Sequence, residues 1–514
     1  MKSEWVQSEA DTARTDRKLV QLSVDGSRLP RPFDRIQCAD LAGWAGDTGA
    51  HEWRKVVASV ADLLSVGAVI APAGAPAPRK LSICVLPFAN MSGDIEQEYF
   101  SDGISEDIIT DLSKVSALSV TARNTAFGFK GKSPNIKDVA RELEVSHVLE
   151  GSVRKAGNRV RITAQLIDGA AGDHIWAERY DRDLDDIFAL QDEISEAIVA
   201  ALKLKLLPAE KQAIERRGTD SAEAYDLYLM ARSYWGTGNN GNPRTQEAIE
   251  RLCARATEID PAYAEAWALM ASSQVVLDRS FQRGAGGKAA LDRALTLNPD
   301  LGEAHALKAR MLMAAGQHEA ALSEVATALR LDPESYLVNS RAGGVYYDMR
   351  RFTDALPYYE RAVALDENDL NSPFMLISCY DVTGDTENRR RVAEIALGRA
   401  EKALAQDRSN GSAMDVGVRA LAALGEPDRA KEWMARALLV DPGNLEMRYN
   451  FACSLATSLE DPEAAIAMLG PALEQDIGIL LPLARTDPDF TSVRDDPRFQ
   501  AMLVAAEARL AAAS

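Results

Sequence analysis

The chain has 514 residues, with 77 acidic against 58 basic side chains and a formal net charge of −19. This length predicts about three domains, and the acidic balance excludes nonspecific nucleic-acid or anionic-lipid binding, so we expect neither nucleic acid nor membrane as a partner. Five scattered cysteines without a CxxC spacing, and a start without a signal-like apolar run, predict a cytoplasmic protein with reduced thiols.

Residues 1–66 predict a small α/β region. Trp5–Arg14 is typical of a helix, Lys18–Val24 alternates like a strand, and a helix is expected at Trp53–Leu64 after the segment Ile36–Leu41. The region ends at a linker, residues 67–79, whose core reads APAGAPAP. Proline and glycine at that density exclude both helix and central strand, so the linker marks a domain boundary.

Several motifs in this first region resemble the second half of a TIR domain. They are the helix with Ser3, Trp5 and Glu9, the loop Pro30-Arg31-Pro32-Phe33, the motif Asp40-Leu41-Ala42-Gly43-Trp44 and the closing Trp53-Arg54. The resemblance implies that Glu9 stands at the place of the catalytic glutamate of NAD-cleaving TIR enzymes, where a carboxylate stabilises an oxocarbenium-like state.

The leading strand, the leading helix and the nucleotide-facing loops of such a domain are missing from the sequence. We therefore expect NAD+ nucleosidase activity only if a complete TIR domain exists upstream. The alternative role for Glu9 is that of a solvated acid in the first turn of a helix, where a negative charge is favourable.

Residues 80–208 predict a mixed α/β domain. Expected strands are Leu81–Phe88 and Leu118–Ala122, followed by an antiparallel meander, and expected helices are Ile104–Leu112, Asn135–Leu143 and Leu190–Leu206. The meander strands are Val148–Lys155, Arg159–Ile167 and Ile175–Tyr180.

This order of elements, with SDGISEDIITDLSK, VSHVLEGSVRKAGNRVRITAQLID and HIWAERYDRDLDDIFALQDEI, resembles the TolB-like amino-terminal domain. In that family the domain usually joins a signalling module, such as an adenylate cyclase or a winged-helix regulator, to tetratricopeptide repeats. The resemblance implies no catalytic role.

Three sets of polar residues in this domain each have a structural and a functional interpretation. The acidic run Ser101–Asp107 lacks the oxygen spacing of a calcium loop, so helix capping by Ser101 or Asp102 is preferred. His147 and His174 on strands favour packing or surface roles over a metal site. The basic hairpin Arg154–Arg161 is compatible with a phosphate, with an acidic partner or with a solvated strand face. We expect no metal and no cofactor.

Residues 221–479 predict an all-α solenoid of the tetratricopeptide type. Pro299 and Pro333 are 34 residues apart, as are Pro333 and Glu367, and that distance recurs between Arg408 and Pro442. The period is broken by an insertion near Arg279–Gly287 and by a longer step after Glu367, which predicts an extended helix. Residues 480–514, with DPDF and DDPRF, are expected to close the last apolar face.

Small and large residues alternate inside one repeat as the tetratricopeptide motif requires. Gly343 and Ala355 are expected to let two helices approach, Tyr346 and Tyr359 to fill the space between hairpins, and Ala362 to admit the next helix. Aromatic side chains here favour core packing over ligand contact.

The sequence therefore predicts a multidomain, non-enzymatic adaptor of bacterial signalling. It would bind protein or peptide partners through the groove of the solenoid, and self-association is compatible with this surface. The alternatives are an NAD-cleaving TIR effector with a truncated start and a regulatory component of an adenylate-cyclase-like system, although no cyclase catalytic segment is recognisable. The adaptor hypothesis expects residues 221–514 alone to capture the partner.

Overall fold

The computed structural model describes residues 21–23, 38–40, 81–132, 134–215, 217–236, 238–239, 241–281, 286–476 and 478–513. Contacts divide the chain into two units, Met1–Arg79 and Lys80–Ser514. In the first unit, β1 (Gln21–Ser23) and β2 (Cys38–Asp40) pair in parallel. β1 lies within the predicted strand Lys18–Val24. Both predicted helices and Glu9 lie outside the described residues, so the resemblance to a TIR domain stays a prediction.

The second unit begins with a mixed sheet in the order β5-β3-β6-β7-β8, and the short β4 also pairs with β6. Its strands are β3 (Leu81–Val85), β4 (Ala89–Asn90), β5 (Leu118–Val120), β6 (His147–Ala156), β7 (Arg159–Asp168) and β8 (His174–Asp183). β3 runs parallel to β5 and β6, whereas β6, β7 and β8 are antiparallel neighbours. The predicted meander is confirmed.

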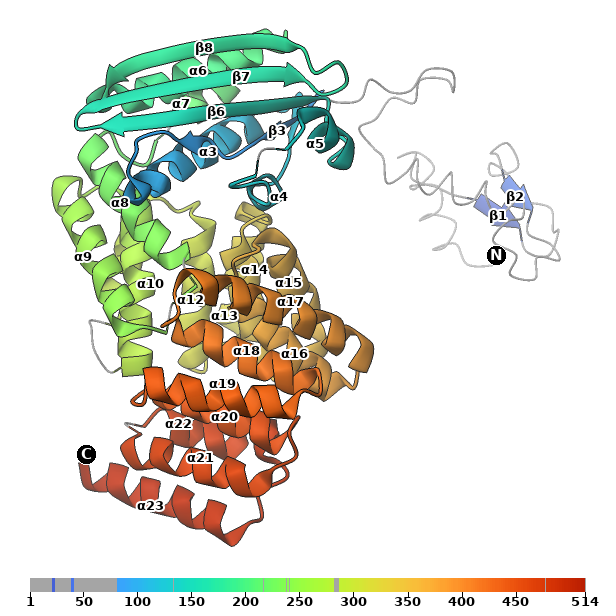
Figure 1. Cartoon of the computed structure of the whole chain (residues 1–514), viewed down its shortest axis with the longest axis vertical. Coiled ribbons are helices and arrows are strands. Elements are labelled where there is room, and N and C mark those ends of the chain that lie inside the picture. The colour runs from blue at the N-terminus through green and yellow to red at the C-terminus, as the bar shows by residue number, and fades with distance from the viewer. Residues whose placement is uncertain are drawn as a thin grey trace, which may run out of the picture. The chain divides into compact units, whose positions relative to one another are not determined.

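Helices pack on both faces of this sheet. They are α3 (Glu98–Ser113), α4 (Arg123–Phe127), α5 (Ile136–Glu142), α6 (Ile187–Ala201) and α7 (Pro208–Glu215). Because successive strand residues point to opposite faces, Ile83 and Val85 join the large core that includes α3 and α6, while Cys84 joins a smaller core with residues of α4 and α5. Figure 1 shows α3 and α6 on one side of the sheet.

The start of α3 overturns the predicted capping role of Ser101 and Asp102. The helix follows a 3-10 turn and begins at Glu98, so both residues lie inside it. Ser105, one turn further on, accepts a hydrogen bond from the N–H of Phe88 at 2.9 Å and donates one to the Ser101 carbonyl at 2.8 Å. The serines on this face are buried. The run Ser101–Asp107 is therefore a packing surface.

That surface joins the α/β domain to the first helical repeat. α8 (Ala222–Gly236) packs on α3, and Tyr225, Tyr228 and Leu229 are at most 9% exposed. Gly103 leaves room for α8, since a Cβ at that position would lie 2.5 Å from Leu229. The two predicted domains thus share one hydrophobic core across this contact.

Carboxylates of α3 and α8 complete this joint. Glu106 pairs with Arg123 at 3.1 Å and with Arg232 at 2.8 Å. Asp107 accepts hydrogen bonds from the Gln191 amide at 2.7 Å and from the Tyr225 hydroxyl. Asp226 accepts one from the Tyr99 hydroxyl at 2.9 Å and pairs with Lys155 at 2.6 Å. Burial raises the pKa of Asp107 to about 6, and the Tyr225 hydroxyl acts in the opposite direction.

Antiparallel helix pairs follow from α8 to α21 (Figure 1). Their remaining bounds are α9 (Pro243–Ile259), α10 (Ala264–Phe281), α11 (Lys288–Leu297), α12 (Gly302–Ala314), α13 (His318–Leu331), α14 (Tyr336–Asp348), α15 (Phe352–Leu365), α16 (Asn371–Thr383), α17 (Thr386–Gln406), α18 (Gly411–Ala423), α19 (Pro427–Val440), α20 (Leu445–Ala456) and α21 (Pro462–Gln475). α12 and α14 begin 34 residues apart, as do α18 and α20. The chain ends with α22 (Leu480–Thr486), η4 (Pro488–Phe490) and α23 (Pro497–Ala513).

The two departures from the period have local causes. α10 has 18 residues and its partner α11 only 10, with the left-handed Gly287 immediately before α11. The longer step after Glu367 corresponds to α17, which has 21 residues, as the prediction of an extended helix required. No helix in the described ranges is long and apolar enough to cross a bilayer.

The predicted motif residues lie in the hairpin of α14 and α15. Gly343 faces the ring of Tyr359, and a Cβ there would lie 2.9 Å from it. Ala355, Tyr359 and Ala362 are at most 1% exposed, and Tyr346 stacks on Tyr358 with ring centroids 5.2 Å apart. The three predicted prolines each stand two residues after a second helix of a pair, where a residue without an N–H cannot extend the helix: Pro299, Pro333 and Pro442.

Two helical glycines give a matched test of this packing. A Cβ on Gly417 of α18 would overlap the ring of Trp433, whereas a Cβ on Gly398 of α17 meets nothing within 4 Å. We expect Gly417→Ala to lower the free energy of unfolding by about 1–3 kcal/mol through overpacking. Gly398→Ala should raise it by about 0.5–1 kcal/mol because alanine favours helix. Urea denaturation measures both, and stabilisation by both substitutions would contradict this account of the hairpin.

Candidate functional site

The first helices of successive repeats contact one another, from α10 and α12 through to α18 and α20. In a helical solenoid, such helices line the inner surface of the superhelix. Polar contacts follow the same surface. They join Arg310 to Asp348 (2.7 Å), Ser372 to Ser340 (3.1 Å), Arg419 to Ser378 (2.9 Å) and Asn450 to Asp415 (2.6 Å). The inner surface is therefore rich in side chains that bind other polar groups.

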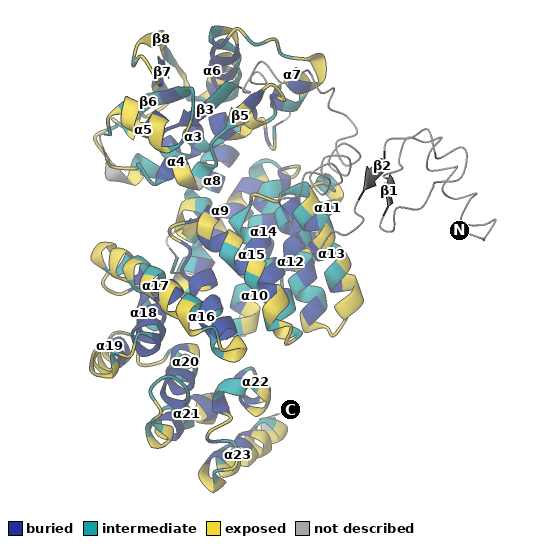
Figure 2. Ribbon diagram, turned by 90° about the vertical axis from the view of Figure 1, so that its right-hand side faces the viewer, coloured by how far each residue is buried: buried dark blue, intermediate teal, exposed yellow. Residues whose placement is uncertain are grey.

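Burial of this inner surface is greatest toward the C-terminal end. α18 and α20 are buried along most of their length, whereas only a few residues of α17 and α19, their neighbours on the outer side, are buried. The contrast is visible in Figure 2, where α18 and α20 are mostly dark blue and α17 and α19 carry much yellow. A first helix buried on its inner side must be covered there by further chain.

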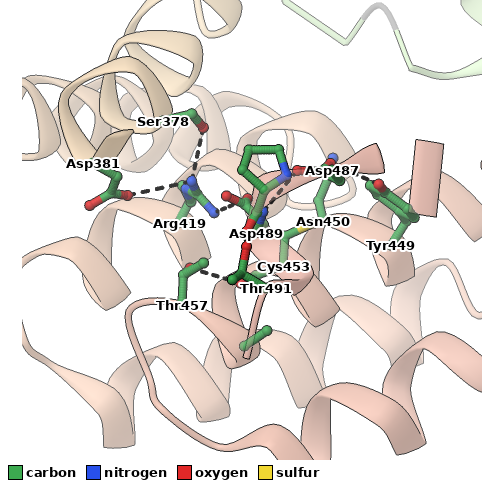
Figure 3. Close-up of polar contacts among 12 residues, drawn as sticks. Ser378, Asp381, Arg419, Tyr449, Asn450, Cys453, Thr457, Asp487, Asp489 and Thr491 are labelled. Carbon is green, nitrogen blue, oxygen red and sulfur yellow. Dashed lines mark hydrogen bonds and ion pairs between the residues drawn. The ribbon is translucent and has the colours of Figure 1, made fainter. Parts of the chain in front are cut away.

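Arg419 of α18 marks the covered place. Its side chain is 1% exposed, and it is the largest fully buried side chain in the described part of the chain. The guanidinium contacts Asp489 at 3.1 Å, Ser378 at 2.9 Å and Asp381 at 3.5 Å, so it joins α16, α18 and a C-terminal segment (Figure 3). Among the described residues its Nε has no hydrogen-bond partner. Arg419 thus lies at the centre of a buried polar site.

The cover is the chain's own segment Thr486–Phe490, called here the inner segment. Asp489 contacts Arg419, and Asp487 accepts a hydrogen bond from the hydroxyl of Tyr449 on α20 at 2.7 Å. Figure 3 shows both carboxylates directed toward these partners. At the other end, Arg350, in the turn after α14, donates to the Thr486 carbonyl at 3.0 Å. The inner segment therefore crosses the inner side of several repeats.

An aromatic contact anchors the inner segment. Phe490 is fully buried, and its ring lies 5.4 Å from that of Tyr449 in an edge-to-face arrangement and 5.6 Å from that of Phe499. Tyr449 thus binds the inner segment twice, through its hydroxyl to Asp487 and through its ring to Phe490. A tyrosine can do this because its ring is apolar and its tip is polar.

The electrostatics of the site depend on burial and on charge pairing. Burial lowers the pKa of Arg419, but the carboxylates of Asp489 and Asp381 raise it more, so the guanidinium stays charged. Burial raises the pKa of Asp489 although Arg419 opposes this. Asp381 also pairs with Arg389 at 2.7 Å. The site therefore places one buried cation between a carboxylate of the repeats and a carboxylate of the inner segment.

Asp415 lies one turn before Arg419, and its carboxyl group should make the free energy of unfolding depend on pH. Burial raises its pKa to about 8, while Asn450 acts in the opposite direction. The folded chain then keeps a proton that the unfolded chain releases above about pH 4. The stability that this proton contributes is present below about pH 4 and is lost as the pH rises to about 8.

We expect Asp415→Asn to remove that dependence. The difference in unfolding free energy between the variant and the wild type should shift in favour of the variant by about 3–4 kcal/mol between pH 5 and pH 9. Thermal denaturation across that range measures it, with the exposed Asp428→Asn as control. Parallel stability profiles of wild type and Asp415→Asn would show that Asp415 is ionised in the folded chain.

Sequence reasoning missed this site. The sequence analysis singled out Asp487-Pro488-Asp489-Phe490 but predicted only that residues 480–514 close the last apolar face. α23 does pack on α21. The inner segment, however, lies on the inner surface of the solenoid. One signal was available, because Arg419 is a lone cation in the run VGVRALAAL of α18. A buried cation in an apolar helix requires an anionic partner.

The other sequence-predicted groups that the structure describes lie apart from this site. Ala355, Tyr359 and Ala362 are core residues of their hairpin, whereas the three motif prolines are exposed, and Glu9 lies outside the described residues. His147 and His174 stand on β6 and β8, which β7 separates. The described residues contain no cluster of three or more metal-ligating side chains. In the basic hairpin, Arg159 and Arg161 pair with Asp181 across the sheet.

Two family models match parts of the chain. The model of the HilA/YgeH-like transcriptional regulator, second domain, matches residues 79–197, and the tetratricopeptide repeat model matches residues 338–369. The second match falls on α14 and α15. The match assigns this hairpin to the tetratricopeptide type, and the stacked helix pairs on either side of it form a tetratricopeptide-like solenoid. The resemblance of residues 80–208 to the TolB-like domain stays a prediction.

A protein of Rhizobium meliloti (strain 1021) named "Putative adenylate cyclase 3" is 56% identical over 191 residues, which are 37% of this chain and 32% of that protein. The chain thus spans about a third of the length of this relative. Among solved structures, a human IFIT1 dimer with PPP-AAAA matches at 15% identity, covering 64% of this chain and 87% of that one, with a TM-score of 0.37. YrrB, a TPR protein with an unusual peptide-binding site, matches at 24% identity, with coverages of 36% and 91% and a TM-score of 0.25.

Proposed function

We propose that this protein is an adaptor of bacterial signal transduction that binds protein partners through the inner surface of its tetratricopeptide repeats. The observation that supports it is the inner segment, a short stretch of polypeptide containing the 3-10 turn η4, which Arg419, Tyr449 and Arg350 hold on this surface. A surface that already binds one peptide segment through side-chain contacts has the chemistry to bind another. The charged groups described above have structural partners, which supports a binding role over a catalytic one.

The α/β domain gives the adaptor a second surface. Because α3 and α8 share one core, the sheet is fixed to the first repeat. The match to the second domain of a transcriptional regulator and the identity with the Rhizobium meliloti protein both support a place in signalling. Four described cysteines are free and buried, which supports the reducing environment of the cytoplasm.

Site-specific photo-cross-linking in the cells that produce the chain tests this function. A photoreactive residue at Asp348, on the inner surface, is compared with one at Arg390, on the exposed face of α17. We expect a discrete cross-linked protein from position 348 and none from position 390. Cross-linking from neither position, or equally from both, would contradict binding through the inner surface.

Regulation of cyclic-nucleotide synthesis is a second candidate, favoured by the 56% identity over 191 residues with the Rhizobium meliloti protein. In this hypothesis the chain modulates a separate cyclase. Deleting the chain should then change the cellular level of cyclic AMP, while the purified chain incubated with ATP should form none. An unchanged cyclic AMP level after deletion would remove this candidate and leave the adaptor role intact.

A further inference from the structure

We propose that the surface around Arg419 is a binding site for an acidic peptide of a partner protein with the pattern Asp-x-Asp followed by an aromatic residue, and that the inner segment occupies this site until the partner displaces it. The inference rests on the proposed adaptor function and names the chemistry of the partner. It follows from three features of the site: its charge, the spacing of the bound carboxylates and the aromatic anchor.

The charge of the empty surface requires an anion. Without the inner segment, the guanidiniums of Arg419 and Arg389 face a single close carboxylate, that of Asp381. A buried cation without a full complement of anionic partners is costly. The surface therefore favours a ligand that brings a carboxylate to Arg419.

The spacing of the bound carboxylates sets the pattern. Asp487 and Asp489 are separated by Pro488, and they reach different repeats: Tyr449 on α20 and Arg419 on α18. The middle proline fixes its own φ, and the Asp489 N–H donates to Asp487 Oδ1 at 3.1 Å, so the relative positions of the two aspartates are restricted. A partner peptide with two carboxylates at the same spacing can make both contacts at once.

The aromatic anchor adds apolar affinity. Phe490 directly follows the second carboxylate and is fully buried against Tyr449 and Phe499. The unpaired Nε of Arg419 leaves a donor for a carbonyl oxygen of a bound peptide. Burying one phenylalanine side chain contributes affinity that charge pairs at a wet surface do not. The expected partner motif therefore ends in an aromatic residue.

The covalent connection of the inner segment makes it a competitor. An intramolecular ligand acts at an effective concentration on the order of millimolar, so a free peptide binds only the fraction of chains whose site is open. Weakening the inner segment should increase that fraction. The same peptide should then bind more tightly although its own contacts are unchanged.

The test is a fluorescence-anisotropy titration of the full chain with a labelled synthetic peptide, Thr-Asp-Pro-Asp-Phe-Thr. The titration compares three proteins: the wild type, the double variant Asp487→Asn/Asp489→Asn, and the exposed control Asp495→Asn. We expect the double variant to bind at least about tenfold more tightly than the wild type, and Asp495→Asn to match the wild type. A peptide with both aspartates replaced by asparagine should bind the double variant about tenfold more weakly.

Two further variants keep the test decisive. Phe490→Ala weakens the inner segment without removing a charge and should also increase affinity for the acidic peptide. Adding Tyr449→Phe to the double variant removes only the hydroxyl and should weaken binding roughly threefold to tenfold.

Two results would overturn the proposal. One is equal peptide affinity in the wild type, the double variant and Phe490→Ala. The other is equal affinity of the double variant for the acidic peptide and its asparagine counterpart. If cross-linking from position 348 persists in either case, the adaptor function stands and only the acidic motif is wrong.

Discussion

Replacing Arg419 by methionine should lower the free energy of unfolding by about 3–5 kcal/mol, the cost of breaking a buried ion pair by removing one partner. Methionine fills much of the volume but leaves Asp489 and Asp381 without the guanidinium between them. The hydroxyl of Ser378 loses its partner as well. The loss should be greatest in the C-terminal repeats, because Arg419 joins α16, α18 and the inner segment.

Arg429→Met is the matched control. Arg429 pairs with Glu401 and Glu426 on the outer side, and its side chain is 47% exposed. Surface pairs of this kind contribute little to stability, because water and salt screen them. Urea denaturation of both variants gives the comparison, and hydrogen exchange shows which helices lose protection. Similar small losses for Arg419→Met and Arg429→Met would show that the Arg419 site is not buried and paired as described.

A fragment of residues 221–514 should be far less stable than one of residues 80–514. The shorter fragment exposes the face of α8 that packs on α3, including Tyr225, Tyr228 and Leu229. Each such side chain contributes about 1.5–3 kcal/mol when buried, so the loss should be several kcal/mol. It also leaves Arg232 without Glu106. The sequence-based expectation that residues 221–514 alone capture a partner stays a prediction.

Melting temperature and solubility of the two fragments measure this effect. The fragment 80–514 should melt as the full chain does, since contacts divide the chain near Arg79. A chain starting at residue 221 that melts cooperatively at the same temperature would show that the joint between α3 and α8 contributes little.

The sequence predicted the parts of the fold that local patterns determine. Alternation identified the meander of β6, β7 and β8, and the 34-residue period identified the repeats, because each pattern follows from the geometry of one element. The greater length of α17 was predicted from the extra residues between Glu367 and the next repeat. These features do not depend on what lies across the molecule.

Contacts between distant segments could not be predicted from the sequence. Glu106 and Asp107 belong to an acidic run for which the sequence favoured helix capping over a cation site, and only α8 and α6 reveal them as partners of Arg232, Tyr225 and Gln191. The inner segment presents the same difficulty. Asp489 and Arg419 are 70 residues apart, and no periodic pattern connects them. Long-range charge pairs depend on how the repeats curve, which one repeat alone does not specify.

The thiol reactivity of Cys453 gives the most direct measurement of whether the inner surface binds an acidic peptide. Cys453 on α20 is 4% exposed and close to the inner segment (Figure 3), whereas Cys379 is fully buried in the core of α16 and serves as internal reference. We predict slow labelling of Cys453 in the wild type and labelling at least about tenfold faster in Asp487→Asn/Asp489→Asn. The acidic peptide should restore its protection. Labelling of Cys453 at the same rate in wild type and variant, or without any effect of the peptide, would contradict the account.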